Sequence, residues 1–231
     1  MRVAVLLSGG KDSVYACYTV LQYGWEVSYL VNIKPLVDDS YMFHSVNTHL
    51  VNIIAESIGI NLLQGESRGE KKEELNDLKH LLMQCSNIDG VVSGAIASEY
   101  QRTCIERICH DLGIRSFTPL WHKNQYNLLK EQVTTGLKIM IVGVSAQGFD
   151  ETWLGRIIDE NCIRDLSELH RRYKVSVSGE GGEYETLVLD APIFKKRIFI
   201  DDMIKEWSRD HGLLRVTKTH LEEKKKNSPS L

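Results

Sequence analysis

The sequence predicts an α/β fold in which a doubly wound, Rossmann-like parallel sheet is followed by a smaller C-terminal α+β domain. Three observations carry this prediction. Short apolar runs alternate with runs of helical length through the first half of the chain. Glycines close several of the helical runs, as expected at helix ends. Beyond Trp121 the regular alternation stops. Repeated strand–helix units are typical of a parallel sheet with helices on both faces.

The strands of the first unit are expected at residues 2–7, 26–33, 60–63, 90–93 and 115–117. The helices between them are expected at residues 14–23, 47–57, 71–84 and 98–111. Gly24, Gly59 and Gly113 mark the ends of three of these helices. Ligands of such sheets bind at the carboxyl ends of the strands, near the switch in strand order. The loop at Ser8 lies at such an end.

The second unit has a less regular pattern. Helices are expected at residues 124–135 and 165–173 and a strand at residues 138–144, with short apolar stretches at residues 187–189, 197–200 and 213–216. The charged tail has nothing apolar to bury and is expected to be disordered. We therefore divide the chain into residues 1–121, residues 122–221 and a tail of residues 222–231.

The composition is that of a globular protein. Of 231 residues, 42% are hydrophobic and 26% are charged, and the net charge is −3. This charge does not favour nucleic acid as the main partner, so tRNA is not expected. Five cysteines without a C-x-x-C pair argue against a disulfide framework or a zinc site. No signal peptide or membrane span is seen, so a cytoplasmic location without membrane contact is expected.

A phosphate cradle is predicted directly after the first strand. The segment reads Ser8-Gly9-Gly10-Lys11-Asp12-Ser13, between an apolar run and a helical run. Paired glycines let backbone N–H groups approach oxyanions, and a helix N-terminus adds free N–H donors. Lys11 supplies a positive charge, and the Asp12 carboxylate suits Mg²⁺.

The spacing excludes two common phosphate motifs. A Walker A loop needs a glycine where Val5 stands, and the dinucleotide fingerprint does not have adjacent glycines. The segment resembles the pyrophosphate loop of the ATP pyrophosphatases, whose domain is of the HUP type and which cleave ATP between the α- and β-phosphates. The alternative is an ordinary glycine-rich turn between strand and helix.

A second unusual segment combines three glutamates with three glycines. It reads Gly179-Glu180-Gly181-Gly182-Glu183-Tyr184-Glu185-Thr186 and leads into an apolar stretch. Glycines permit an irregular backbone close to a ligand. Clustered carboxylates repel one another unless a cation, a metal or a proton is shared. The alternative is a solvated acidic turn.

With both segments in one chain, the sequence resembles the diphthine–ammonia ligase family. The resemblance extends to about Pro192 and includes the stretches 93–96, 99–101, 119–121 and 148–156. Two positions depart from the family pattern. Cys104 stands where arginine is frequent, and His122 stands where glycine is frequent.

The resemblance implies an ATP-dependent, AMP- and pyrophosphate-forming amide ligase. It would convert the carboxylate of diphthine, a modified histidine on translation elongation factor 2, into an amide with ammonia through an acyl-adenylate. Residues 1–121 would then be the ATP-binding domain and residues 122–221 the acceptor domain. Fixed N–H groups, Lys11 and Mg²⁺ would stabilise the departing pyrophosphate. This makes ATP the co-substrate, Mg²⁺ the metal ion, and elongation factor 2 and ammonium the partners.

The implied site residues fall into four groups. ATP would be bound by Ser8, Gly9, Gly10, Lys11, Asp12, Ser13, Asn32, His44, Ser93 and Gly94. The metal would be held by Asp12. Catalysis would involve Lys11, Glu180, Glu183 and Glu185, with Glu183 as the proton acceptor for ammonia. The acceptor would contact Tyr100, Gln101, Trp121, Trp153, Gly181, Gly182, Tyr184 and Thr186, and Tyr184, Trp121 and Trp153 are candidates for a partial cage around its trimethylammonium group. For each tryptophan, core packing is the simpler alternative.

Two other functions are compatible with the residues. A tRNA-modifying pyrophosphate-loop enzyme would need a basic face. A non-catalytic adenine-nucleotide sensor would not need the complete phosphate loop. The sequence leaves the oligomeric state open, a homodimer included.

Overall fold

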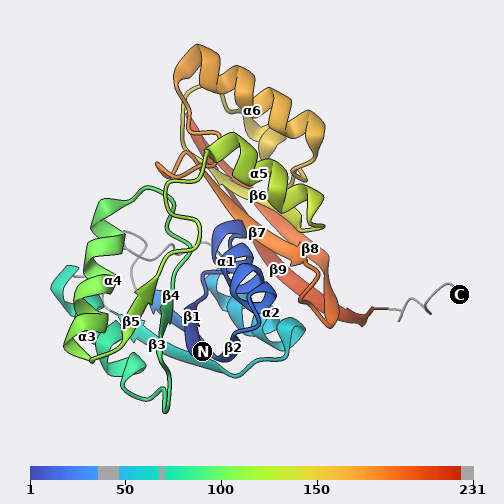
Figure 1. Ribbon diagram of the computed structural model, residues 1–231. Helices are drawn as coiled ribbons and strands as arrows, with labels where there is room; N and C mark the ends of the chain where they lie inside the picture. Colours follow the sequence, from blue (N-terminus) through green and yellow to red (C-terminus); the bar gives the residue numbers. More distant parts are fainter. Residues whose placement is uncertain (36–46, 68–70, 225–231) are drawn as a thin grey trace, which may run out of the picture.

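The computed structural model describes residues 1–35, 47–67 and 71–224. Figure 1 shows two sheets, with the helices of the first half around one and α5 and α6 beside the other. His44, predicted to contact ATP, lies outside the described residues.

The first sheet is parallel and has five strands, in the order β3-β2-β1-β4-β5. Its strands are β1 (Arg2–Leu6), β2 (Glu26–Pro35), β3 (Leu62–Ser67), β4 (Gly90–Val92) and β5 (Arg115–Phe117). Strand order reverses at β1, because β2 and β3 extend the sheet on one side and β4 and β5 on the other. The loops after β1 and β4 therefore meet at the topological switch point, where ligands bind in such folds.

Helices cover both faces of this sheet. They are α1 (Lys11–Gln22), α2 (Val51–Ile58), which follows the 3₁₀ turn η1 (Thr48–Leu50), α3 (Lys71–Leu82) and α4 (Glu99–Asp111). Adjacent β1 residues point to opposite faces: Val3 and Val5 pack with α1 and α2, whereas Ala4 packs with α3 and α4. The predicted doubly wound sheet is confirmed.

The second sheet is antiparallel, with the order β7-β6-β9-β8. Its strands are β6 (Lys138–Val144), β7 (Tyr184–Asp190), β8 (Lys196–Ser208) and β9 (His211–Glu223). The other elements of this half are α5 (Gln125–Thr134), the 3₁₀ turn η2 (Glu151–Trp153) and α6 (Glu160–Tyr173). The smaller α+β unit is thus confirmed as a fold class.

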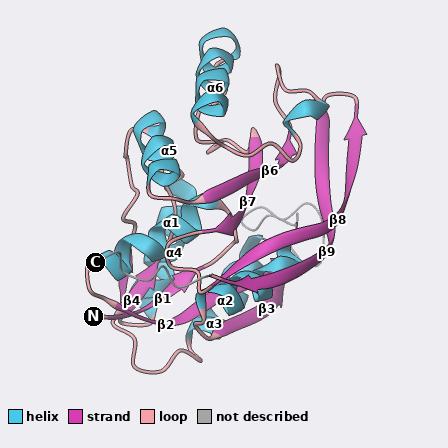
Figure 2. Cartoon of the chain, turned by 90° about the vertical axis from the view of Figure 1, so that its right-hand side faces the viewer, coloured by secondary structure: helices cyan, strands magenta, loops and turns pink. Residues whose placement is uncertain are grey.

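The β8–β9 hairpin extends well beyond the short apolar stretches expected at residues 197–200 and 213–216. Figure 2 shows the two strands running side by side. In β8 only Ile198 is buried, so the strand has almost no alternation of apolar and polar residues to reveal it. The start of the disordered tail was also predicted too early in the sequence. Glu222 and Glu223 belong to β9 and pair with Arg197 and Lys196. The rest of that tail from residue 225 lies outside the described residues.

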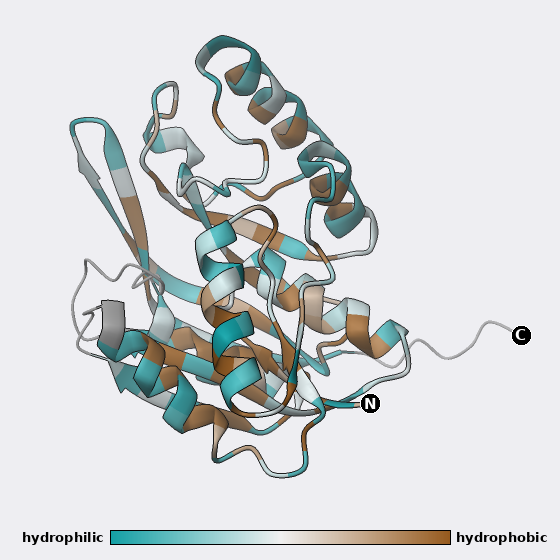
Figure 3. Ribbon diagram, turned by 60° about the vertical axis from the view of Figure 1, so that its left-hand side comes forward, coloured by the Kyte–Doolittle hydropathy of each residue, from teal (hydrophilic) through white to brown (hydrophobic). Residues whose placement is uncertain are grey.

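One hydrophobic core runs through both halves of the chain. It joins residues of β1, α1 and α2 to residues of β6, β7 and α6, including Val14, Ile54, Ile139, Leu166 and Val188. α1 contacts β7, and α2 contacts β8. Figure 3 shows apolar residues along the strands and on the helix sides that face them. The division at residue 121 therefore does not correspond to a gap in the core.

Most of the cysteines are packed in the interior. Cys17, Cys85, Cys109 and Cys162 are buried thiols, and Cys104 is half-buried. Burial raises the pKa of Cys17 to about 12, which keeps its thiol protonated and inert. Among the described residues, no helix is both long and apolar enough to cross a membrane.

α6 begins five residues earlier than the sequence pattern indicated, because Asp159 caps it. The Asp159 carboxylate accepts a hydrogen bond from the Cys162 N–H at 2.8 Å. Such a cap satisfies an N–H group that has no partner within the helix.

We predict that Asp159→Ala lowers the free energy of unfolding by about 1 kcal/mol, the usual cost of removing an N-cap side chain. Asp159→Asn keeps a side-chain oxygen and should retain most of the stability. Urea unfolding followed by circular dichroism measures both variants. An alanine variant as stable as the unmodified protein would show that the cap contributes nothing.

Candidate functional site

A cavity of about 200 Å³ lies where the two predicted segments meet. The lining residues come from the phosphate loop, from the ends of β2 and β4, from α4 and from the second motif. They include Ser8, Gly10, Lys11, Asp12, Ser13, Asn32, Ser93, Gly94, Gln101, Gly179, Glu180, Gly182, Tyr184, Glu185 and Thr186. Residues far apart in the sequence thus form one site at the switch point.

The conformation of the phosphate loop is set by Gly9 and by hydrogen bonds of the Ser13 hydroxyl. Gly9 has φ +87°, and a Cβ there would lie 2.7 Å from Ile54 Cδ1. The Ser13 hydroxyl bridges the Ser8 N–H at 3.2 Å and the Gly10 carbonyl at 3.0 Å. α1 then begins at Lys11 without a side-chain cap. The start of α1 at the cavity is therefore suited to an anion.

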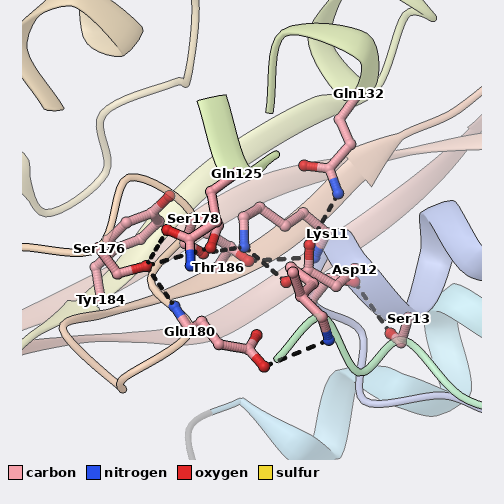
Figure 4. Close-up of polar contacts among 12 residues, drawn as sticks. Lys11, Asp12, Ser13, Gln125, Gln132, Ser176, Ser178, Glu180, Tyr184 and Thr186 are labelled. Carbon is pink, nitrogen blue, oxygen red and sulfur yellow. Dashed lines mark hydrogen bonds and ion pairs between the residues drawn. The ribbon is translucent and has the colours of Figure 1, made fainter. Parts of the chain in front are cut away.

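Lys11 joins the phosphate loop to the second motif. Its ammonium donates to the Ser178 carbonyl at 2.5 Å and to Asp12 Oδ2 at 2.7 Å, and only 3% of the residue is exposed. Its backbone N–H donates to Thr186 Oγ1 at 3.2 Å. Figure 4 shows these contacts converging on Lys11. The predicted phosphate-binding charge is thus already engaged by groups on both sides of the cavity.

Asp12 receives hydrogen bonds on both carboxylate oxygens. Oδ2 accepts from Lys11, and Oδ1 accepts from Gln132 Nε2 at 2.8 Å. Gln132 lies on α5 and is fully buried. Gln132 could not be identified from the sequence, because a glutamine within a helix carries no local signal of its contacts.

Glu180 binds the backbone at the start of α4. Its Oε1 accepts from the N–H groups of Ile96, Ala97 and Ser98 at 3.3, 2.8 and 3.0 Å. A hydrogen bond to a charged group contributes about 1.5–3 kcal/mol. A carboxylate beside a helix N-terminus gains about 0.3–1 kcal/mol more. Glu180 therefore connects the second motif to the segment after β4.

The Glu183 carboxylate accepts hydrogen bonds from the backbone of its own loop. Oε1 accepts from the Ser176 N–H and Oε2 from the Gly181 N–H, both at 2.8 Å. A Cβ at Gly181 would lie 2.9 Å from Glu183 Oε1, so the glycine makes room for this contact. Both oxygens of the predicted proton acceptor are thus occupied by backbone donors, and Glu183 is not among the residues that line the cavity.

Glu185 is the acidic residue of β7 at the cavity. It pairs with Gly143 of β6, where a Cβ would lie 3.1 Å from Glu185 Cβ. Among the described residues, no group of three or more Asp, Glu, His or Cys side chains is arranged to hold a metal ion. The backbone N–H groups that donate to Glu180 and Glu183 offset the repulsion expected of clustered carboxylates.

Tyr184 is buried, with 3% of its surface exposed. Its hydroxyl donates to the Val177 carbonyl at 2.7 Å, and Lys11 Nζ lies 5.5 Å from the ring centroid. Burial, followed by the charge of Asp12, holds the pKa of Tyr184 well above its usual value. The phenol therefore stays protonated and serves as a hydrogen-bond donor.

The ends of β2 and β4 supply a compact wall. Asn32 bridges the Leu7 carbonyl and Gln64 with hydrogen bonds of 2.8 Å each. Gly94 lies against α1, where a Cβ would lie 2.7 Å from the Asp12 carbonyl carbon. Ser93 is 4% exposed, and its hydroxyl has no hydrogen-bond partner in the described structure. A buried hydroxyl of this kind, in a residue that lines the cavity, fits a polar ligand group.

The predicted aromatic cage is not assembled. Trp153 is 7% exposed and packs edge-on against Phe149 at 4.9 Å. Trp121 stacks on His122 at 4.7 Å and is covered by the Arg102 guanidinium. Neither tryptophan lines the cavity, so the packing alternative holds for Trp153. Tyr100 is exposed on α4, whereas its neighbour Gln101 does line the cavity.

The two departures from the family pattern have different surroundings. His122 has φ +55°, a left-handed conformation that glycine adopts most readily. Its N–H donates to the Ile96 carbonyl at 2.8 Å. Cys104 is half-buried on α4 and does not line the cavity.

Both halves of the chain match known proteins in sequence. Residues 1–116 match the diphthamide synthase N-terminal domain, and residues 124–221 match the diphthamide synthase C-terminal domain. The chain is 35% identical to the diphthine–ammonia ligase of Homo sapiens over 99% of this chain and 96% of the human protein. It is 36% identical to the diphthine–ammonia ligase of Danio rerio over 97% of this chain and 98% of the fish protein.

Two further matches are partial. The chain is 36% identical to the diphthine–ammonia ligase of Schizosaccharomyces pombe over 87% of this chain but 36% of the longer fungal protein. A solved structure of a predicted tRNA methyltransferase subunit from Methanocaldococcus jannaschii covers 83% of the chain and 98% of its own, with a TM-score of 0.43 and 13% identity. That likeness is too distant to say anything about function. Because both domain matches occur in order and the human relative aligns along almost the entire chain, the chain belongs to the diphthamide synthase family.

Proposed function

We propose that this protein is an ATP-dependent amide ligase that joins ammonia to the diphthine carboxylate of translation elongation factor 2, with release of AMP and pyrophosphate. The observation that carries the proposal is the single cavity lined by both the phosphate loop and the second motif. Relatives that align along almost the full chain bear the name diphthine–ammonia ligase. Because the proposed substrate is a translation factor, we also propose a cytoplasmic location.

The ATP site is proposed at the carboxyl ends of β1, β2 and β4. Ser8, Gly9, Gly10 and Ser13 would cradle the phosphates, with Lys11 behind them. The buried Ser93 hydroxyl, Asn32 and Gly94 form the wall toward the adenosine. In this division, residues 1–121 bind ATP and residues 122–221 supply the acceptor side.

Asp12 fits a magnesium ion as the single carboxylate of the phosphate loop. Mg²⁺ commonly takes one or two carboxylates together with substrate phosphates and water. Its chemistry would be to neutralise charge on the leaving pyrophosphate. Hydrogen bonds from Lys11 and Gln132 keep the Asp12 carboxylate oriented toward this role.

The first step activates the acceptor. A carboxylate oxygen of diphthine attacks the α-phosphorus of ATP, and the bond to the β-phosphate oxygen breaks. The N–H groups at the start of α1 and the Lys11 ammonium stabilise the negative charge that develops on pyrophosphate. Because these donors are fixed before the reaction, little reorganisation is needed.

The second step forms the amide. The ammonia nitrogen attacks the acyl carbon, the bond from that carbon to the AMP oxygen breaks, and a proton leaves the nitrogen. We assign the proton acceptor to Glu185, which lines the cavity, instead of Glu183, whose oxygens hold the loop. Gly182, Gln101 and Thr186 border the same space and are proposed acceptor contacts.

The nucleotide products test the reaction class. We predict that ATP yields AMP and pyrophosphate when diphthine-bearing elongation factor 2 and ammonium are both present. Ion-exchange chromatography of the reaction mixture identifies the products. ADP and phosphate as the main products would reject the pyrophosphate-loop chemistry.

Lys11→Met tests the charge in the phosphate loop. Loss of one preorganised charge contact should slow AMP formation roughly 100-fold or more. Stability should fall as well, because Asp12 and the Ser178 carbonyl lose a partner. Initial rates are compared after thermal melts have confirmed folding. Lys79→Met, which removes a half-buried lysine on α3 paired with Asp111, is the matched control and should leave the rate unchanged.

Glu185→Gln and Glu183→Gln separate chemistry from loop structure. Glu185→Gln should bind ATP normally, form adenylate in a single turnover and fail to complete the amide. Glu183→Gln replaces one carboxylate oxygen by an NH₂ group that cannot accept an N–H, so it should lower the melting temperature. Calorimetry, single-turnover assays and thermal melts give the three readouts. A fully active Glu185→Gln beside a stable, inactive Glu183→Gln would reverse the assignment.

A further inference from the structure

The segment Gly179–Gly182, here called the strap, borders the cavity on the side of the second motif. Gly179, Glu180 and Gly182 all line the cavity. The strap belongs to the C-terminal half of the chain, yet Glu180 reaches across to the segment between β4 and α4. Figure 4 shows the Glu180 side chain extending away from Ser176 toward that segment.

The strap is anchored at each end, to α1 of the first half before it and to its own half after it. Before it, the Ser178 carbonyl accepts from Lys11 Nζ. At its far end, Ser145 Oγ donates to the Gly182 carbonyl at 2.7 Å. The strap contains three glycines, of which Gly179 and Gly182 have positive φ angles of +68° and +79°. A backbone of this composition gains little rigidity from its own sequence. Ser176 and Glu183 hold it within its own half, and the Glu180 side chain ties its middle to the segment before α4.

Glu180 ties the strap to the start of α4 by an arrangement that favours a charged acceptor. A single oxygen, Oε1, receives three backbone N–H groups, those of Ile96, Ala97 and Ser98. Those groups stand at the N-terminus of α4, a helix of 13 residues whose dipole favours an anion there. The Ser98 hydroxyl accepts from the Gln101 N–H, which fixes the same turn and a residue that lines the cavity.

We propose that Glu180 is a positioning residue that latches the strap over the cavity and excludes water from the acyl-adenylate. The inference rests on the proposed function. An acyl-adenylate reacts with water as well as with ammonia. Water attacks the acyl carbon, the bond to the AMP oxygen breaks, the acceptor returns as the free carboxylate, and protons pass to solvent. ATP is then consumed without amide formation, and a closed site prevents this loss.

The latch predicts a defect in coupling between AMP release and amide formation. In the unmodified protein, one AMP should be released for each amide formed. In Glu180→Ala, AMP should exceed amide, because water enters while adenylation continues. Glu180→Gln keeps an acceptor oxygen without the charge and should lie between the two. A purely structural defect would lower AMP and amide in the same proportion.

Backbone hydrogen exchange gives a second readout that does not depend on activity. The N–H groups of Ile96, Ala97 and Ser98 should exchange about 10–100-fold faster in Glu180→Ala, the change expected from losing hydrogen bonds to a charged group. The matched control is Glu160→Gln. It removes an exposed carboxylate from the first turn of α6, a helix that lies entirely in the C-terminal half. It should leave both exchange and coupling unchanged.

The experiment measures AMP by chromatography, amide by mass spectrometry of elongation factor 2, and exchange by mass spectrometry or NMR. Excess AMP together with faster exchange of the three amides supports the latch. Faster exchange with AMP and amide still equal overturns it. If the unmodified protein forms no AMP, the proposed function fails; the latch is then judged by exchange alone, and unchanged exchange in Glu180→Ala rejects it.

Discussion

The buried ammonium of Lys11 is the contact on which the rest of the site depends. It lies between the Asp12 carboxylate and the Ser178 carbonyl, so one charge joins the start of α1 to the loop before β7. Transferring a charge from water into the protein interior costs free energy. For Lys11 this cost is offset only when the Asp12 carboxylate and the Ser178 carbonyl are both in place. The phosphate loop is therefore complete only when the C-terminal half is docked. The shared hydrophobic core holds the two halves in that position.

The carboxylates of the second motif illustrate how backbone donors decide what a charged residue can do. Glu183 satisfies two N–H groups of its own loop, and Glu180 satisfies three N–H groups of a distant helix start. A carboxylate held in this way stabilises the shape of a site more than it moves protons. Glu185, on a regular strand, is among the residues that line the cavity. One acidic motif thus supports the shape of the site and contains the residue that we propose as the proton acceptor.

The parts of the molecule that local chemistry determines could be predicted from the sequence, and the parts that depend on distant contacts could not. The phosphate loop and the parallel sheet follow from glycine spacing and apolar runs, and both were predicted. The contact between Gln132 and Asp12 depends on how α5 packs, and no local pattern shows it. The same holds for Glu183, whose residue type suited a base but whose neighbours are backbone donors. Trp153 is buried for a similar reason: its environment comes from Phe149 and the core around it.

The exposed β8 strand has a consequence for how copies of this protein behave at high concentration. β8 is the edge of the second sheet, and an edge strand offers unpaired backbone groups to any other strand. Its sequence carries charges of both signs at Lys196, Arg197, Asp201, Asp202, Lys205 and Glu206, and its register shifts between Ile200 and Met203. Charges and a bulge both discourage strand addition from another molecule. The charged residues and the bulge interrupt the apolar periodicity of β8, which made the strand hard to predict. They also protect the protein against aggregation through the β8–β9 hairpin.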